Sequence, residues 1–276
     1  MPAAGDAAAG LPALLQPLAA EPDRSALFLD FDGTLAAIVE DPTAARPLPG
    51  VPALLAALAS RFALVAVISG RPTAFLAEVL GSPPGVTLAG LYGLERALSG
   101  PAHRAWASVI DEVVAEATAT APEGVYVEPK GLTVTLHWRR APAQKDWVVG
   151  FAARQHEARD LMIHEGRHER ELRPPLDVDK GTVVRALVAE HDERAEPLRA
   201  VAAFGDDIGD LPAFAALDEL RAAAVRPLTA VRVAAVDTES PPAVAAAADL
   251  SVPGAAGAVA LLRALAEAAV SGTAQP

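Results

Sequence analysis

The stretch ALFLDFDGTLAAI, residues 26–38, begins as an apolar run and then places two carboxylates two positions apart, at Asp30 and Asp32. The apolar run is typical of a buried β-strand. Ionised carboxylates at the end of such a strand are costly unless another group compensates their charge. We therefore expect the rest of the chain, or a ligand, to supply that compensation.

Further apolar runs, at residues 63–70, 85–93 and 199–207, alternate with helical patterns. This alternation is typical of parallel strands that are buried on both faces. Residues 101–178 differ, because a long helical pattern is followed by strands with a period of two. We predict an α/β fold, with a Rossmann-like parallel sheet flanked by helices and a smaller α+β unit inserted in it.

These patterns predict the domain organisation. We expect residues 1–20 to be a flexible N-terminal tail, residues 21–100 and 179–270 to form the core domain, and residues 101–178 to form the inserted domain.

The composition excludes several classes of function. The 276 residues include no cysteine, so disulfides and thiol nucleophiles are excluded. The formal net charge of −12, without a basic stripe, argues against a nucleic-acid partner. We find no apolar stretch long enough to cross a membrane and no signal peptide, and we expect a cytoplasmic protein that acts on a small molecule.

Polar residues follow the predicted strands at the ends where ligands of open parallel sheets bind. Besides Asp30 and Asp32, they are Ser69, Gly70, Arg71, Asp206, Asp207 and Asp210, while Lys180 opens a helix. Several aspartates in one crevice repel each other unless a hard cation such as Mg²⁺ binds them. Hydroxyl groups of Thr34 and Ser69, backbone N–H groups near Gly33 and the charge of Lys180 suit a phosphoryl group.

The same residues resemble the four ordered motifs of the haloacid dehalogenase-like (HAD) phosphohydrolases. The motifs are DFDGT at 30–34, SGR at 69–71, the lysine of DKG at 179–181 and GDDIGD at 205–210. The resemblance implies that Asp30 attacks phosphorus and forms an aspartyl-phosphate. It implies that Asp32 protonates the leaving oxygen and then deprotonates the hydrolytic water.

The resemblance also implies a ligand set for Mg²⁺ and for phosphate. The metal would be held by the Asp30 side chain, the Asp32 backbone carbonyl and Asp206, while Asp207 and Asp210 would complete its shell or orient Lys180. Thr34, Ser69 and Lys180 would hold the phosphoryl oxygens.

The inserted unit resembles the cap domains of sugar-phosphate phosphatases, and among them those of the trehalose-6-phosphate phosphatases. The supporting segments are GLYGLE at 90–95, VEPKG at 127–131, HWR at 137–139, ELRP at 171–174 and DKG at 179–181. The resemblance implies that Glu128, Lys130 and Glu171 bind sugar hydroxyls and that Arg71 lies at the seam between cap and core. It also implies a functional link to a separate trehalose-6-phosphate synthase.

Three residues depart from the pattern of this family. Gly209 and Leu211 stand where threonine and glutamate are usual, and Tyr92 stands where histidine or asparagine is usual.

Two other functions remain open from the sequence. The chain is either a phosphatase for another sugar phosphate, such as sucrose phosphate or mannosyl-3-phosphoglycerate, or a regulatory protein that binds a sugar phosphate without hydrolysing it. The presence of both Asp30 and Asp32 argues against the regulatory protein, because binding alone needs no nucleophile and acid pair.

Overall fold

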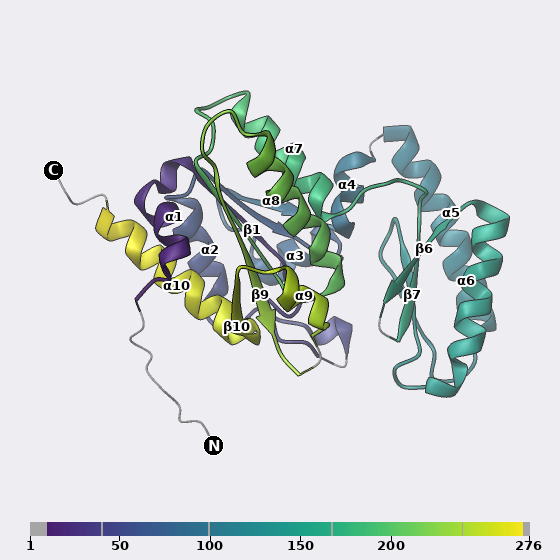
Figure 1. The fold of residues 1–276 in the computed structure, drawn as a ribbon. Coiled ribbons are helices and arrows are strands. Elements are labelled where there is room, and N and C mark those ends of the chain that lie inside the picture. The colour runs from purple at the N-terminus through teal and green to yellow at the C-terminus, as the bar shows by residue number, and fades with distance from the viewer. Residues whose placement is uncertain (1–9, 40, 99, 167, 239, 273–276) are drawn as a thin grey trace, which may run out of the picture. The chain divides into compact units, whose positions relative to one another are not determined.

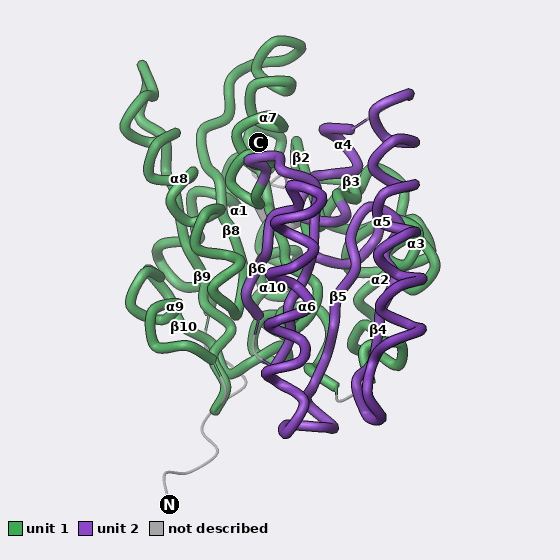
Figure 2. Tube along the Cα trace, turned by 90° about the vertical axis from the view of Figure 1, so that its right-hand side faces the viewer, with its two compact units in different colours: residues 1–69, 74–89, 179–276 green, residues 70–73, 90–178 purple. Residues whose placement is uncertain are grey.

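The computed structural model describes residues 10–39, 41–98, 100–166, 168–238 and 240–272 (Figure 1). The chain divides into two compact units (Figure 2). Unit 1 takes in residues up to 69, residues 74–89 and residues from 179 onward, and unit 2 takes in residues 70–73 and 90–178.

A parallel sheet of six strands forms the centre of the described part of unit 1, in the order β10-β9-β8-β1-β2-β3. Its register pairs Phe28 of β1 with Ala66 of β2 and with Ala203 of β8. The strands are β1 (Ser25–Leu29), β2 (Leu64–Ile68), β3 (Val86–Ala89), β8 (Ala200–Gly205), β9 (Thr229–Val236) and β10 (Leu250–Pro253). The predicted parallel sheet is confirmed, although β9 and β10 were not among the predicted strands.

Helices cover both faces of this sheet (Figure 1). Leu27 and Leu29 of β1 pack on one side, and Ala26 and Phe28 pack on the other, so every position of the strand is buried. The first layer holds α1 (Gln16–Ala20), α2 (Val51–Ala59), α3 (Thr73–Leu80) and α10 (Gly254–Gly272); the second holds α7 (Lys180–Asp192), α8 (Leu211–Ala223) and α9 (Pro242–Ala247).

The N-terminal segment differs from the flexible tail expected over residues 1–20. Residues 1–9 lie outside the described residues, but the segment that follows is helical, as η1 (Ala13–Leu15) and α1. Leu15 and Leu18 are completely buried in the core layer that contains α10. Their burial anchors a segment whose composition of alanine, proline and glycine gives only a weak helical pattern.

The described part of unit 2 contains an antiparallel sheet in the order β4-β5-β7-β6. One face of this sheet packs on α5 and α6, through side chains such as Leu136, Leu172 and Phe151. The elements are α5 (Gly100–Thr120), β4 (Tyr126–Pro129), β5 (Val134–His137), α6 (Lys145–Arg159), β6 (Met162–Gly166) and β7 (Glu169–Arg173).

Unit 2 starts earlier in the chain than the inserted domain expected from residue 101. The segment after β3 forms η4 (Leu91–Gly93) and α4 (Leu94–Ala97). Leu91, Leu94 and Leu98 are buried against Leu132, which lies between β4 and β5. The short helices that remain are η2 (Pro22–Arg24), η3 (Pro42–Ala44), η5 (Pro142–Gln144) and η6 (Ile208–Asp210).

Throughout the part of the chain that the structure describes, we find no helix with the length and apolar character needed to cross a membrane.

Candidate active site

The topology of unit 1 brings the ends of β1 and β8 together. The strands that follow β1 in sequence, β2 and β3, lie on one side of it, whereas β8, β9 and β10 lie on the other. Ligands of open parallel sheets bind at such a switch point. Asp30 follows β1 and Asp206 follows β8, and the backbone N–H of Asp30 donates to the carbonyl of Phe204 at 3.0 Å.

Three carboxylates from these loops form a group that is able to hold a metal ion. One oxygen from each of Asp30, Asp206 and Asp210 lies within 4.8 Å of the others. Asp30 and Asp210 are buried, with 6% and 2% of their surface exposed. Oxygen atoms alone make up this donor set, which is the set that a hard divalent cation prefers.

Lys180 contacts two of these carboxylates. It is the first residue of α7, whose N-terminus is capped by Asp179 through a hydrogen bond of 2.7 Å from the N–H of Thr182. Its ammonium group donates to Oδ1 of Asp30 and, at 2.6 Å, to Oδ1 of Asp210. Burial would lower the pKa of Lys180, but the charges of Asp210 and Asp30 outweigh burial and raise it.

Asp210 also fixes the loop that carries Asp206. Its Oδ2 accepts the backbone N–H groups of Asp206 at 2.9 Å and Asp207 at 3.1 Å. Both oxygens of this carboxylate are therefore held by the protein. The geometry favours Asp210 as the residue that orients Lys180 and the loop.

The side chain of Asp207 has a different place from the one predicted for a metal ligand. Asp207 is exposed, and its carboxylate accepts the backbone N–H of Ile208 at 2.7 Å, so it caps η6. The structure does not bring Asp207 into the group of three carboxylates.

Residues around the first strand complete the site in unit 1. Asp32 is partly exposed and its charge acts on Asp30. Gly33 has φ +79°, and a Cβ there would overlap the carboxylate of Asp206. Ser69 is buried at the end of β2, where its N–H donates to the carbonyl of Ala89 at 3.0 Å.

The hydroxyl group of Thr34, which follows Asp30 and Asp32 in the sequence, is a further candidate to contact a ligand. It is completely buried, and its hydroxyl has no hydrogen-bond partner among the described residues. A buried hydroxyl without a partner is costly. An oxygen of a bound phosphoryl group would satisfy it.

The electrostatics of the three carboxylates fit a bound cation. Burial, with the charges of Asp30 and Asp210, raises the pKa of Asp206 to about 10. Burial raises the pKa of Asp30 to about 7, against the opposing charge of Lys180. One lysine does not compensate three carboxylates, and a divalent cation would restore both pKa values toward their usual range.

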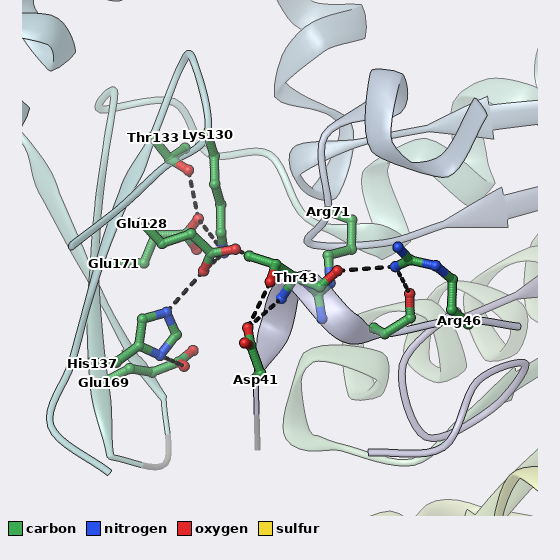
Figure 3. Close-up of polar contacts among 11 residues, drawn as sticks. Asp41, Thr43, Arg46, Arg71, Glu128, Lys130, Thr133, His137, Glu169 and Glu171 are labelled. Atoms are coloured by element: carbon green, nitrogen blue, oxygen red, sulfur yellow. Dashed lines mark hydrogen bonds and ion pairs between the residues drawn. The ribbon is translucent and has the colours of Figure 1, made fainter. Parts of the chain in front are cut away.

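Unit 2 holds a second polar cluster, which contains the residues expected to bind sugar (Figure 3). The ammonium group of Lys130 lies 3.6 Å from Glu128 and 3.7 Å from Glu171, and Arg71 lies 3.7 Å from Glu128. Thr133 donates to Glu171 at 2.6 Å. The structure therefore brings these four predicted residues together.

Two residues of this cluster, His137 and Glu169, were not identified as functional from the sequence. His137 lies 2.8 Å from Glu128 and 3.0 Å from Glu169 (Figure 3). The period of two along residues 133–137 placed His137 on the polar face of its strand. The partners became visible only with the strand register, which sets His137 opposite Glu169.

Gly70, predicted to follow a strand at the ligand-binding end of the sheet, lies beside the ring of Tyr92 in unit 2. A Cβ at Gly70 would lie 2.6 Å from the hydroxyl of Tyr92. The ring of Tyr92 also lies near His164, with centroids 5.6 Å apart, and under the guanidinium of Arg173. Tyr92 therefore packs within unit 2.

Comparisons with known proteins agree with this geometry. The C-terminal domain of the C. albicans trehalose-6-phosphate phosphatase superposes with a TM-score of 0.69 at 25% identity, over 95% of this chain and 99% of that one. A haloacid dehalogenase-like hydrolase from Bacteroides thetaiotaomicron superposes with a TM-score of 0.56 at 15% identity, over 87% of this chain and 98% of that one. Unit 1, with aspartates after β1 and β8, therefore has the fold of the HAD hydrolases.

A sequence relative and a family model define the family. The trehalose-phosphate phosphatase of Mycobacterium marinum is 38% identical over 205 residues, which are 70% of this chain and 52% of the relative. The chain thus spans about half the length of the curated relatives it matches. The model of the trehalose-phosphatase family matches residues 28–252. The chain belongs to the trehalose-phosphatase family.

Proposed function

We propose that this chain is a Mg²⁺-dependent phosphatase that hydrolyses trehalose 6-phosphate to trehalose and phosphate. The observation that carries the proposal is the contact of Lys180 with Asp30 beside Asp206 and Asp210. This arrangement supplies a nucleophile, a fixed cation and a metal site at one switch point of the sheet. Family membership supports the choice of substrate.

The reaction follows from the roles of two aspartates. A carboxylate oxygen of Asp30 attacks phosphorus, and the bond from phosphorus to the sugar oxygen breaks while Asp32 gives that oxygen a proton. Asp32 then accepts a proton from water, whose oxygen attacks the phosphorus of the aspartyl-phosphate. The bond to Asp30 breaks, phosphate leaves, and both carboxylates return to their starting states.

Other residues of unit 1 hold the phosphoryl group. Lys180 and the hydroxyl groups of Thr34 and Ser69 bind its oxygens, which positions phosphorus for attack by Asp30. Mg²⁺ would be held by the carboxylates of Asp30 and Asp206 and by the backbone carbonyl of Asp32, and it would supply positive charge that offsets the phosphoryl charge.

Unit 2 acts in this proposal as the sugar-binding cap domain. Glu128 and Glu171 accept hydrogen bonds from sugar hydroxyls, and Lys130 and Arg71 donate to oxygen atoms. Support comes from the grouping of these four side chains, with ion-pair distances of 3.6–3.7 Å. At these distances the carboxylates keep lone pairs for a ligand.

A phosphate-release assay tests the proposal. The full chain is assayed with Mg²⁺ against trehalose 6-phosphate, sucrose 6-phosphate, mannosyl-3-phosphoglycerate and glucose 6-phosphate, and again after chelation. We expect the highest kcat/KM with trehalose 6-phosphate and its loss with the chelator. Preference for another sugar phosphate would contradict the proposed substrate but leave the proposed phosphatase activity intact. The absence of turnover with every ester would contradict the phosphatase activity itself.

A further inference from the structure

His137 lies between two carboxylates, one at each nitrogen of its ring. Nε2 is 2.8 Å from Oε2 of Glu128 on β4, and Nδ1 is 3.0 Å from Oε2 of Glu169 on β7. Carboxylate oxygens only accept hydrogen bonds when ionised, and a neutral imidazole donates from one nitrogen. Both contacts form together when His137 is an imidazolium ion.

We propose that His137 is a positioning residue for sugar binding, whose imidazolium form is held by Glu169 and fixes the carboxylate of Glu128. This inference rests on the proposed function. It adds a dependence of substrate affinity on pH that comes from unit 2 rather than from the reacting carboxylates.

The distances around Glu128 single out His137 as the group that orients it. Lys130 and Arg71 lie 3.6 and 3.7 Å from the carboxylate, beyond hydrogen-bond distance, whereas His137 lies 2.8 Å away. Lys130 and Arg71 contribute positive charge, but the contact with His137 at 2.8 Å fixes the orientation of the Glu128 carboxylate. Glu171 is held comparably, by Thr133 at 2.6 Å.

Packing restricts the ring of His137. Its side chain is 15% exposed, and the ring of Tyr126 stacks on it with centroids 5.6 Å apart and planes 26° apart. Tyr126 and His137 are directly opposed in the register of β4 and β5. The imidazolium therefore presents Nε2 in one direction.

The groups that face His137 favour its charged form. They are the carboxylates of Glu128 from β4 and Glu169 from β7, while Lys130 lies beyond Glu128. Burial would lower the pKa of His137, but the hydrogen bonds to Glu128 and Glu169 outweigh burial and raise it. Burial would raise the pKa of Glu128, but the hydrogen bond from His137 and the charges of Lys130, His137 and Arg71 lower it to about 2.

The affinity for the sugar phosphate should fall when His137 loses its proton. A raised pKa keeps His137 charged at and above the pH at which a free histidine loses its proton, about 6.5. As pH rises through the pKa of His137 in the folded protein, the hydrogen bond to Glu128 weakens. KM for the sugar phosphate should therefore rise across that pH range, while kcat should change less.

The experiment compares His137→Phe, His137→Gln and Glu169→Gln in the full chain, with whichever sugar phosphate the wild type prefers. Loss of one hydrogen bond to a charged group raises KM roughly 10- to 100-fold in the two His137 variants. Their KM no longer varies over the pH range in which the wild-type KM rises. Glu169→Gln removes one of the two carboxylates that stabilise the imidazolium ion, so the rise in KM moves to lower pH.

A matched control and a second readout keep the test decisive. His103→Gln, on α5, should leave KM and its pH profile as in the wild type. NMR titration of the histidine rings, assigned with His137→Gln, should give His137 a pKa above about 6.5. A neutral His137 at pH 7, or an unchanged pH profile of KM in the His137 variants, would overturn the inference. Failure of the proposed function is distinct, because the wild type would then turn over no sugar phosphate.

Discussion

The ammonium group of Lys180 lies 2.6 Å from Oδ1 of Asp210, while Oδ2 of the same carboxylate accepts the backbone N–H groups of Asp206 and Asp207. One carboxylate thus links the start of α7 to the loop after β8. Lys180 also contacts Asp30, so the three loops of the site are joined through two charged side chains.

Asp30→Asn should abolish turnover and keep substrate binding. An amide is a poor nucleophile, so we expect kcat to fall by at least about 10³-fold. The residues that we propose to bind the sugar lie in unit 2, so calorimetry should still detect binding of trehalose 6-phosphate. Full activity of this variant would exclude the aspartyl-phosphate mechanism.

Lys180→Met should destabilise the fold as well as abolish activity. Removing one partner of a buried ion pair costs about 3–5 kcal/mol, because the other charges stay buried without compensation. Urea unfolding measures the loss. The double variant Lys180→Met with Asp210→Asn should recover part of it, whereas Lys145→Met, at an exposed site on α6, should change stability little. Equal stability of Lys180→Met and Lys145→Met would contradict the contacts of Lys180 with Asp30 and Asp210.

Asp206→Asn should stabilise the metal-free protein and remove its response to Mg²⁺. The substitution removes one of three neighbouring carboxylates. Each kcal/mol gained raises Tm by about 2–4 °C in a protein of this size. Asp207→Asn is the control, because that side chain caps η6 and is exposed, and Mg²⁺ should raise its Tm as in the wild type. If Mg²⁺ raised the Tm of Asp206→Asn as much as that of the wild type, Asp206 would be excluded as a metal ligand.

Gly33→Ala should impair activity far more than a comparable glycine substitution. Both Gly33 and Gly81 have positive φ, at +79° and +71°. Alanine in this backbone conformation costs about 1–2 kcal/mol at either site. A Cβ at Gly33 would also overlap the carboxylate of Asp206, whereas no atom lies within 4 Å of one at Gly81 among the described residues. Thermal unfolding and kcat/KM separate the two effects, and equal kcat/KM for both variants would contradict the close approach.

Leu18→Ala and Leu14→Ala test whether the N-terminal helix belongs to the core. Leu18 is completely buried and Leu14 is 48% exposed. We expect Leu18→Ala to lower the free energy of unfolding by about 2–5 kcal/mol and Leu14→Ala by less than about 0.5 kcal/mol. Urea denaturation measures both. Similar small losses would show that the helix is dispensable.

The parallel sheet was predictable because its central strands are continuous apolar runs, as at residues 25–29 and 200–205. Strand β10 was missed because it has four residues, LSVP, with a serine and a proline that interrupt the apolar pattern. It lies at the edge of the sheet, where such residues are tolerated. The burial of the N-terminal segment in the core was not predicted, because tertiary contacts of Leu18 in α1, rather than intrinsic propensity, stabilise it.

The candidate site was predictable where chemistry requires particular residues next to strand ends, as at Asp30 and Asp206. It was not predictable where the role depends on a partner far away in the chain. Asp207 and Asp210 look alike in the sequence, but one caps a short helix and the other holds Lys180. His137 needed the register of β5 and β7 to bring Glu169 beside it.

The sheet of unit 2 carries its hydrophobic core on one face and its charged cluster on the other, at alternating positions of the same strands. Under the proposed function, substitutions at every second position of these strands would change the preferred sugar while the packing of the other face is preserved. In unit 1, by contrast, helices bury both faces of the sheet, so substitutions on either face alter the packing. Divergence of specificity within this family should accordingly concentrate on one side of one small sheet, while the phosphoryl chemistry stays constant.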